Sequence, residues 1–313
     1  MNIAIIGRTH ILLETAKHLE KAGYKIKLVI TAKEAPEYKA SVFDYRKFAR
    51  KKEAYFIEAQ NINKKVKILS KKIKKFDIQI GLSMNYISVI SQEIIDLFPL
   101  GILNAHLGNL PKYRGNATIN WAIINREPKM ALCIHRMMGG ELDSGDIITR
   151  AYKNITLDTK VTEFYHWMEE KMPVLFKDAL IKLAKNPKYI LEKQSRNPKD
   201  ISRCYPRIPE DSRIDWRKNN VDILTLINAS AEPFQGAYTF YDGKKIIIWD
   251  AELYFDKEKY LAMPGQIAEI NKTDGYIIVI CGQGKLKIKE IQIDNYRGIP
   301  SLKINSIRKR FIL

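Results

Sequence analysis

The 313-residue chain is poor in cysteine and histidine, which limits the sites it can build. It has three cysteines, far apart in the sequence, and five histidines without the spacing of metal ligands; neither Cys-x-x-Cys nor His-x-x-x-His occurs. Few cysteines, odd in number, are typical of a reducing compartment and exclude a disulfide framework. Without paired ligands we expect no structural metal site.

Long apolar runs are also lacking. No stretch approaches the roughly 20 apolar residues that span a bilayer. The apolar start, Ile3 to Ile6, is interrupted by Gly7-Arg8-Thr9-His10 and is too short for the apolar core of a signal peptide. We therefore expect a cytoplasmic, unprocessed protein without a membrane partner.

Acidic residues are scarce relative to basic ones. The chain carries 53 Lys and Arg against 35 Asp and Glu, a formal net charge of +18. Such a charge favours anionic partners: nucleotide phosphates, nucleic acid or a polyglutamylated cofactor. The lysines are spread along the chain, however, as in KKVKILSKKIKKFD, so a merely solvated basic surface is the alternative interpretation.

The first 31 residues indicate an α/β fold. MNIAIIG has the pattern of a buried strand, THILLETAKHLEKAGY has helical periodicity, and KIKLVIT is a second strand. This β-α-β order predicts a Rossmann-like domain with a mostly parallel sheet. Neither a Gly-x-Gly-x-x-Gly nor a Walker A motif is present, so nothing supports a dinucleotide or ATP site.

The remaining pattern predicts two domains. Strands are expected over 76–83, 101–106, 130–137 and 146–152, with helices over 43–53, 61–75, 91–98, 116–125 and 162–185. A polar segment with three prolines, 194–212, then precedes a β-rich region with a Tyr-Asp-Gly hairpin turn. We predict an α/β catalytic domain over 1–200 and a smaller β-rich, OB-like domain over 201–313.

Two polar side chains stand at the end of the strand expected over 101–106. Asn104 and His106 are two residues apart and so face the same side of a strand, at the edge where α/β sheets bind ligands. An Asn amide can donate to an oxyanion and a His can move protons, a pair suited to acyl transfer. Because Gly-x-Ser-x-Gly is absent, direct transfer to an external nucleophile is favoured over a covalent acyl-enzyme.

A third residue could orient the imidazole. Asp143 lies in the glycine-rich segment GGELDSGDII and could hold His106 as the acid of a triad. Taken alone, each of these signals has a simpler interpretation: a turn cap, a surface histidine or ordinary turn chemistry. His135, within an apolar strand pattern, is interpreted as a buried core residue with its hydrogen bonds satisfied.

Together, LNAHLGNLPKYRG, NWAI and HRMMGGELDSGDII resemble the folate-dependent formyltransferases, which transfer a formyl group from N10-formyltetrahydrofolate to an amine. The family pattern is Asn-x-His-x-Ser-Leu-Leu-Pro-x-Tyr-Arg-Gly followed by Leu-Asp-x-Gly-Asp. A later block, IDW…EPFQGAYTF…KKIIIWDAEL, resembles the start of the family's C-terminal domain, so the resemblance covers nearly the whole chain. One departure is that Gly108 and Asn109 replace the Ser and the following Leu, which puts any hydroxyl contact there in doubt.

The resemblance implies catalytic roles for Asn104, His106 and Asp143. The substrate amine would attack the formyl carbon while Asn104, helped by His106, stabilises the oxyanion. His106 would take the amine proton and aid its transfer to the folate N10, and Asp143 would hold His106. No metal is implied.

The resemblance also places the formyl donor, N10-formyltetrahydrofolate, against two segments, largely through backbone groups. These cofactor-binding residues are Met84, Asn85, Tyr86 and Ile87, and Met138, Gly139, Gly140, Glu141 and Leu142. Core packing is the alternative interpretation for Met84, Tyr86 and Ile87.

The acceptor amine is less determined. Methionyl-tRNA formyltransferases carry an arginine-rich insertion after the second strand, and here TAKEAPEYKASVFDYRKFARKK is basic but does not match it. NLPKYRG, HRM and RCYPRIPEDSRIDW instead resemble the domain that formylates a UDP-linked amino-arabinose and its relatives acting on dTDP-amino sugars. A glycinamide ribonucleotide enzyme would lack the C-terminal domain. We expect a sugar-nucleotide N-formyltransferase acting on a dTDP- or UDP-4-amino-deoxy sugar for surface polysaccharide synthesis.

Acceptor contacts are expected from Arg8 and His10, after the first strand, and from Tyr205 and Arg207; turn residues and a packed linker are the alternatives. Trp216 and Trp249 are expected to pack the second domain. The resemblance makes a homodimer the expected assembly.

A non-catalytic alternative is a basic RNA-binding protein, with nucleic acid held by an OB-like domain. Tyr276, Lys285, Lys287 and Lys289 match that pattern only in part, so a nucleic-acid partner is not expected.

Overall fold

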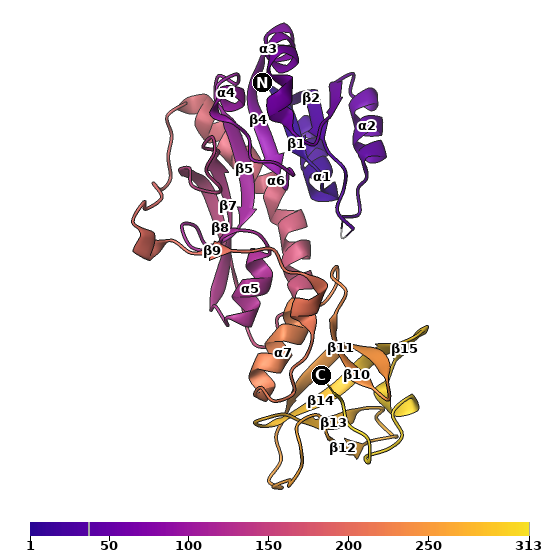
Figure 1. Cartoon of the computed structure of the whole chain (residues 1–313). Coiled ribbons are helices and arrows are strands. Elements are labelled where there is room, and N and C mark those ends of the chain that lie inside the picture. The colour runs from indigo at the N-terminus through magenta and orange to yellow at the C-terminus, as the bar shows by residue number, and fades with distance from the viewer. Residues whose placement is uncertain (37, 313) are drawn as a thin grey trace. The chain divides into compact units, whose positions relative to one another are not determined.

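The computed structural model describes residues 1–36 and 38–312, which form two compact units (Figure 1). The first unit comprises Met1–Thr118, Met130–Lys153 and Tyr165–Cys204. The second comprises Ile119–Lys129, Asn154–Phe164 and Tyr205–Leu313. Two segments that precede residue 200 therefore cluster with the C-terminal part, a feature that the linear division at residue 200 did not include.

The first unit is built on a seven-stranded sheet with the order β3-β2-β1-β4-β5-β7-β8. Its strands are β1 (Asn2–Gly7), β2 (Lys25–Thr31), β3 (Tyr55–Glu58), β4 (Ile78–Met84), β5 (Ile102–Leu107), β7 (Lys129–Arg136) and β8 (Ile147–Asn154). The pairs among β1 to β5 are parallel, whereas β7 runs antiparallel to β5. The predicted α/β fold with a mostly parallel sheet is confirmed.

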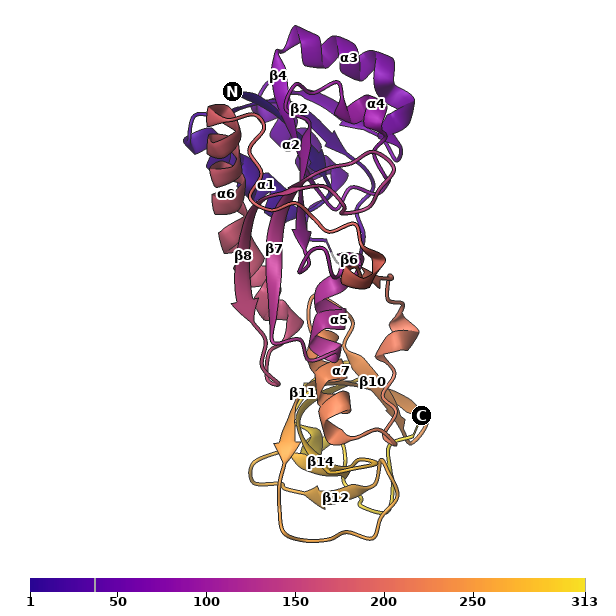
Figure 2. The ribbon, with the colours of Figure 1, turned by 90° about the vertical axis from the view of Figure 1, so that its left-hand side faces the viewer.

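Helices cover both faces of this sheet, as Figure 2 shows. They are α1 (His10–Lys21), α2 (Val42–Lys51), α3 (Val66–Lys75, after the short helix η1, Ile62–Lys65), α4 (Gln92–Ile95) and α6 (Val161–Lys185). On β1, Ile3 and Ile5 pack in one core with α1, α2 and α6, while Ala4 and Ile6 pack in another with α3 and α4. Burial on both faces explains why the strands read as continuous apolar runs.

Two predicted helices are shorter than expected. The helix expected over 91–98 is a single turn, α4, because Phe98 precedes Pro99 and such a position disfavours the helical conformation. The helix expected over 116–125 is α5, Thr118–Ile124. It begins later because Ala117 has a positive φ of 49° and the Asn116 N–H donates to the Cys204 carbonyl.

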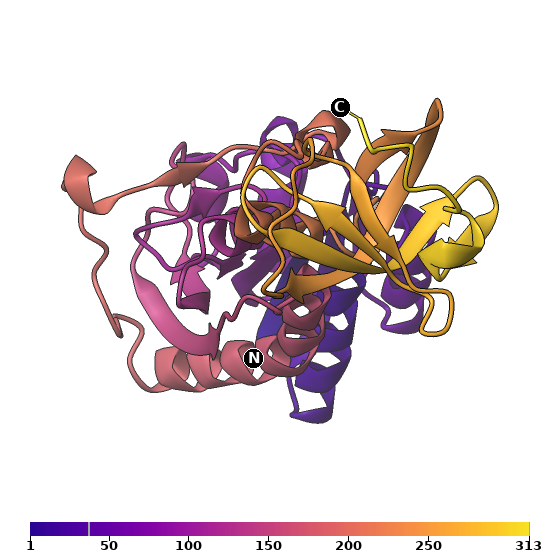
Figure 3. The ribbon, with the colours of Figure 1, turned by 90° about the horizontal axis from the view of Figure 1, so that it is seen from below.

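The second unit contains an antiparallel sheet, drawn orange to yellow in Figure 3. Its order is β10-β11-β14-β13-β12, with β15 also paired to β14. The elements are α7 (Asn220–Ala229), β10 (Ala237–Tyr241), β11 (Lys244–Tyr254), β12 (Ile267–Ile270), β13 (Ile277–Ile280), β14 (Lys285–Ile293), β15 (Tyr296–Gly298) and the short helices η3 (Pro209–Ser212) and η4 (Pro300–Leu302). The predicted β-rich C-terminal domain is confirmed.

Local features of the second unit follow the sequence. Asp242 and Gly243 both have positive φ, which is the conformation of a tight hairpin turn, and they join β10 to β11 as predicted. Trp216 lies in the apolar core, 2% exposed, and stacks on Phe311 at 5.3 Å between ring centroids. Trp249 is 8% exposed and donates from Nε1 to Gln292.

The polar segment 194–212, whose composition is that of a linker or a structured crossing loop, carries structure of its own. It contains the short helix η2 (Pro198–Asp200) and β9 (Arg203–Cys204), which pairs in parallel with β6 (Arg114–Gly115). The Tyr113 N–H also donates to the Ser202 hydroxyl at 2.8 Å. The segment thus lies along the loop that follows β5. Within the described residues, no helix is long and apolar enough to cross a membrane.

The close approach of β1 to β4 gives a stability prediction. A Cβ added to Gly7 would lie 2.2 Å from the Met84 carbonyl oxygen, which is backbone and cannot easily move. A Cβ on Gly81 would meet only Ile side-chain ends, at 3.0 and 3.3 Å. We expect Gly7→Ala to lower the free energy of unfolding by about 1–3 kcal/mol, and Gly81→Ala to cost less. Urea denaturation checks both variants, and equal losses would contradict this account of the strand contact.

Candidate active site

The site is built where β5 pairs with β7. Asn104 and His106 lie on β5, and the antiparallel register places His135 opposite Asn104 and Cys133 opposite His106. Directly opposed residues of an antiparallel pair project to the same face. The segment after β7 then returns Asp143 to these side chains.

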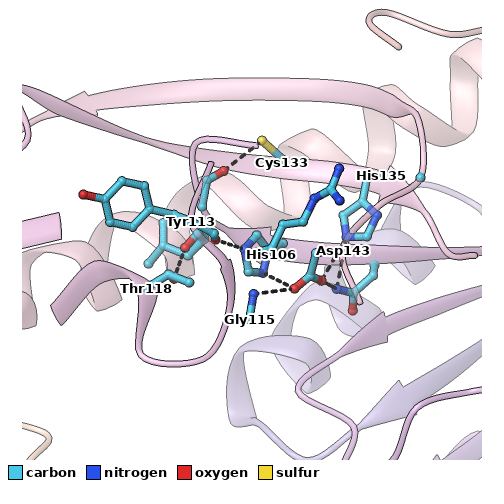
Figure 4. A network of polar contacts seen from close by, with 12 residues as sticks. His106, Tyr113, Gly115, Thr118, Cys133, His135 and Asp143 are labelled. Atoms are coloured by element: carbon cyan, nitrogen blue, oxygen red, sulfur yellow. Dashed lines mark hydrogen bonds and ion pairs between the residues drawn. The ribbon is translucent and has the colours of Figure 1, made fainter. Parts of the chain in front are cut away.

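The Asp143 carboxylate lies between two imidazoles (Figure 4). Its Oδ2 is 3.4 Å from His106 Nδ1 and accepts from the Gly115 N–H at 2.9 Å. Its Oδ1 is 3.4 Å from His135 Nε2 and 3.4 Å from Asn104 Nδ2. The structure therefore brings the three predicted catalytic residues together.

Two members of this cluster were not predicted. His135 is buried and hydrogen-bonded, as expected, with Nδ1 2.8 Å from the Arg136 carbonyl. Its Nε2, however, lies beside Asn104 and Asp143, and the interpretation as a core residue did not include that contact with the site. Gly115 contributes through its backbone N–H. His135 could have been found from an antiparallel pairing of 130–137 with 101–106, whereas a backbone donor leaves no signal in the sequence.

A latch holds the Asp143 segment in place. The Gln194 amide donates from Nε2 to the carbonyls of Asp143 and Gly145, at 2.9 and 2.7 Å. Its Oε1 accepts two hydrogen bonds from the buried Arg114 guanidinium, at 3.2 and 2.8 Å. Asp143 itself has a φ of +53°, an uncommon conformation for a residue with a side chain. The Arg114–Gln194 latch thus supports a strained backbone position.

The Asp143 carboxyl is ionised in this setting. Burial by itself raises the pKa of Asp143, but the neighbouring His106 and His135 and the Gly115 N–H together lower that pKa well below its usual range. A buried anion with cationic and N–H partners is stabilised in its charged form. The carboxylate is therefore present throughout the neutral pH range.

His106 is held at both ring nitrogens. Its Nε2 lies 2.7 Å from the Tyr113 carbonyl oxygen, and its Nδ1 faces Asp143. Both neighbours are acceptors, so both contacts are hydrogen bonds only when the ring carries two protons. The site thus holds an imidazole, 8% exposed, between two acceptor groups.

Comparison with known proteins identifies the family. The family model "Formyl transferase" matches residues 1–180, and "Formyl transferase, C-terminal domain" matches residues 207–304. The chain is 31% identical over 304 residues to a methionyl-tRNA formyltransferase of Caldanaerobacter subterraneus subsp. tengcongensis, covering 95% of this chain and 94% of that one. The chain belongs to the formyl transferase family. It is an enzyme.

Solved structures share the fold of this formyltransferase. WlaRD, a sugar 3N-formyl transferase solved with dTDP and 5-N-formyl-THF, superposes with a TM-score of 0.67 at 21% identity, over 95% of this chain and 98% of WlaRD. HypX from Aquifex aeolicus, solved with tetrahydrofolic acid, gives a TM-score of 0.64 at 13% identity. The match covers 98% of this chain but only 47% of HypX, so the formyltransferase spans about half of that protein.

The non-catalytic alternative is wrong, because the family is enzymatic. The structure also accounts for the lysines on which that alternative depended. Lys285 pairs with Asp256, Lys287 with Glu252, and Lys289 with both Asp250 and Glu252. These cations are neutralised within the second unit of the formyltransferase.

The glycine-rich cofactor segment is bonded to α4, which begins five residues after the other predicted segment, 84–87, ends. The Gly139 N–H donates to Gln92 Oε1 at 2.9 Å, which joins the glycine-rich segment to the residues that follow β4. The Met84 side chain is buried in the core, and the Tyr86 hydroxyl donates to the Ala59 carbonyl, so these two side chains are engaged within the protein. The exposed side chains are those of Asn85, Ile87, Glu141 and Leu142.

The predicted acceptor residues are held in other ways. Arg8 donates to the carbonyls of Asn85 and Lys33 and stacks over the Tyr38 ring. His10 Nε2 lies 2.7 Å from Glu169. Among the described residues, no hydrogen bond or ion pair joins Arg8 or His10 directly to Asn104, His106 or Asp143.

The other two predicted acceptor residues belong to the second unit. Tyr205 is 72% exposed. The Arg207 guanidinium donates to the Asp211 carbonyl and to the hydroxyls of Ser212 and Ser230. Arg207 therefore bonds within its own unit. A contact of Arg207 or Tyr205 with the acceptor stays a prediction.

The charge of Asp143 predicts a pH-dependent stability. A carboxyl whose pKa is lowered by folding stabilises the fold at every pH above its unfolded pKa of about 3.9, and loses that contribution as the pH falls toward the folded value. We expect Asp143→Asn to lower the free energy of unfolding most near neutral pH, with a difference from wild type that shrinks below about pH 4. Urea titrations at several pH values measure this, with the exposed Asp77→Asn as control. A difference that grows on acidification would contradict the assigned ionic contacts.

The position of the His106 ring predicts what a side chain at residue 108 would do. A Cβ on Gly108 would lie 2.2 Å from His106 Nε2 and 2.5 Å from the Tyr113 carbonyl oxygen. We expect Gly108→Ala to displace the ring and break its bond to Tyr113. Imidazole ¹⁵N spectra are simple because the chain has five histidines. Unchanged His106 signals in Gly108→Ala, matching those of the control Asn109→Ala, would refute this arrangement.

Proposed function

We propose that this formyltransferase moves the formyl group of N10-formyltetrahydrofolate to the amine of a nucleotide-linked amino sugar, a 4-amino-deoxy sugar on dTDP or UDP. The observation that carries formyl transfer is the convergence of Asn104, His106 and Asp143 in one hydrogen-bonded cluster. The sugar nucleotide is supported by the sequence resemblance around His135-Arg136-Met137 and by the shared fold with WlaRD.

Direct transfer is favoured over a covalent acyl-enzyme. Cys133 stands opposite His106 and is the thiol nearest in register to the imidazole. It is fully buried, donates to the Gly108 carbonyl, and burial raises its pKa to about 11. A protonated, buried thiol is a poor nucleophile. The amine of the acceptor is therefore the attacking group.

The transfer makes one bond and breaks another. The amine nitrogen bonds to the formyl carbon, the bond from that carbon to N10 breaks, and the proton that the amine loses ends on N10. An Asn104 N–H, helped by His106, stabilises the oxyanion that forms on the formyl oxygen, and Asp143 holds His106. His106 takes the amine proton on a ring nitrogen and passes it to N10, so Nε2 must first turn away from the Tyr113 carbonyl.

The described residues fit a folate. Ile87 and Leu142 are 48% and 38% exposed, so each of the two predicted cofactor segments, 84–87 and 138–142, offers apolar surface. Gly140 has a φ of +75° and nothing within 4 Å of an added Cβ, so its backbone is open to a ligand. The pterin would contact the backbone of Met138–Leu142 and of the residues after β4. No group of three or more His, Cys, Asp or Glu that could hold a metal ion occurs in the described part of the chain.

Methionyl-tRNA is the second candidate acceptor. It is favoured by one specific observation, the 31% identity to a methionyl-tRNA formyltransferase over 95% of this chain. Both acceptors present a primary amine, so the chemistry of the Asn104 cluster does not discriminate between them. We also propose that the protein forms a homodimer, which the sequence resemblance supports.

An acceptor panel tests the proposal. The purified protein is assayed with N10-formyltetrahydrofolate and dTDP- or UDP-linked 3- and 4-amino sugars, or charged initiator tRNA, by tetrahydrofolate release and product mass. We expect turnover of a sugar nucleotide with little formylation of tRNA. Efficient tRNA formylation with no sugar turnover would reverse the choice of acceptor.

Variants in the same assay test the mechanism. We expect His106→Asn to lower kcat by about 10²–10⁴ and Asn104→Ala by about 10²–10³. His18→Asn, an exposed histidine on α1, is the matched control and should retain wild-type activity. Activity of His106→Asn within threefold of wild type would refute its role.

A further inference from the structure

His135 occupies a buried position with one defined tautomer. It is 1% exposed and stands opposite Asn104 in the β5–β7 register. Its Nδ1 lies 2.8 Å from the Arg136 carbonyl oxygen. A carbonyl oxygen can only accept, so Nδ1 carries a proton, and in a neutral ring Nε2 then presents its lone pair on the other side.

That lone pair faces the Asn104 amide. His135 Nε2 is 3.3 Å from Asn104 Nδ2, and both atoms are 3.4 Å from Asp143 Oδ1. The three atoms form a nearly equilateral triangle, so the two acceptors are about 60° apart as seen from Nδ2. The two N–H bonds of an amide nitrogen diverge by about 120° and are both donors. One N–H can therefore serve both acceptors, and the other is directed away from them.

We propose that His135 is a positioning residue that fixes the rotation of the Asn104 amide, so that one N–H is permanently aimed at the oxyanion. The proposal rests on the proposed function, in which Asn104 is the oxyanion donor. Without the Nε2 acceptor, only Asp143 Oδ1 at 3.4 Å would hold the amide nitrogen inward. A turn of the amide by half a revolution would then present its carbonyl oxygen, which repels an oxyanion.

Two substitutions separate this role from simple packing. Asn at position 135 can reproduce the Nδ1 bond to the Arg136 carbonyl but is too short to reach Asn104. Gln reaches the place of Nε2 and can accept from Asn104 while it donates to Asp143. A packing role makes the smaller Asn and the longer Gln comparably harmful, whereas a positioning role makes Gln the better replacement.

The kinetic test compares these variants with N10-formyltetrahydrofolate and the acceptor turned over in the panel. Because a lost oxyanion donor costs about 10²–10³ and here the donor is only freed to rotate, we expect His135→Asn to lower kcat by roughly 10- to 50-fold with KM unchanged. His135→Gln should stay within about threefold of wild type, with the same shape of pH profile. In an Asn104→Ala background, His135→Asn should cost less than about twofold, because the group it positions is gone. Equal losses in His135→Asn and His135→Gln, or a full loss in the Asn104→Ala background, would overturn the proposal.

A second measurement needs neither a variant nor an acceptor. In wild-type protein at neutral pH, imidazole ¹⁵N spectra should show His135 protonated at Nδ1 and unprotonated at Nε2. A neutral His135 protonated at Nε2, or a doubly protonated ring, would overturn the proposal. If no acceptor in the panel is turned over, the proposed function fails while this spectrum still decides the state of His135.

Discussion

The structure of the site depends on one buried negative charge, the Asp143 carboxylate. An ion at 7% exposure is costly unless its oxygens find donors or opposite charge. Here the partners come from separate parts of the first unit: β5 supplies Asn104 and His106, and the loop after β5 supplies the Gly115 N–H. Each segment must therefore reach its place before the charge is stabilised, so the site and the fold around it are energetically coupled.

The reversal of one strand makes this arrangement possible. In the parallel part of the sheet, neighbouring strands end at the same edge and contribute mainly the loops that follow them. Because β7 is antiparallel to β5, it contributes side chains directly opposite Asn104 and His106, and the glycine-rich segment begins where β7 ends. The hydrogen bonds of the Arg114–Gln194 latch then fix the backbone of that segment. They hold Asp143 at a φ of +53°.

The replacement of the family's Ser by Gly108 has a local counterpart in the structure. The space where a Cβ would stand is occupied by His106 Nε2 and the Tyr113 carbonyl. His106 is thus held from both sides, by a carboxylate on Nδ1 and a carbonyl on Nε2. A side chain at residue 108 and the present position of the His106 ring therefore exclude each other.

The sequence by itself determined what is local. Alternation along 101–106 placed Asn104 and His106 on one face, Asp242-Gly243 set a hairpin turn, and the helical periods located α1 to α3. The glycine-rich segment GGELDSGDII pointed to Asp143, and motifs shared with a known family implied its catalytic role. Tertiary structure alone decided the remaining contacts: His135 with Asn104 across 31 positions, Gly115 with Asp143 across 28, and Gln194 with Asp143 across 51. These depend on strand register and on backbone groups, and neither is encoded in the identity of a single residue.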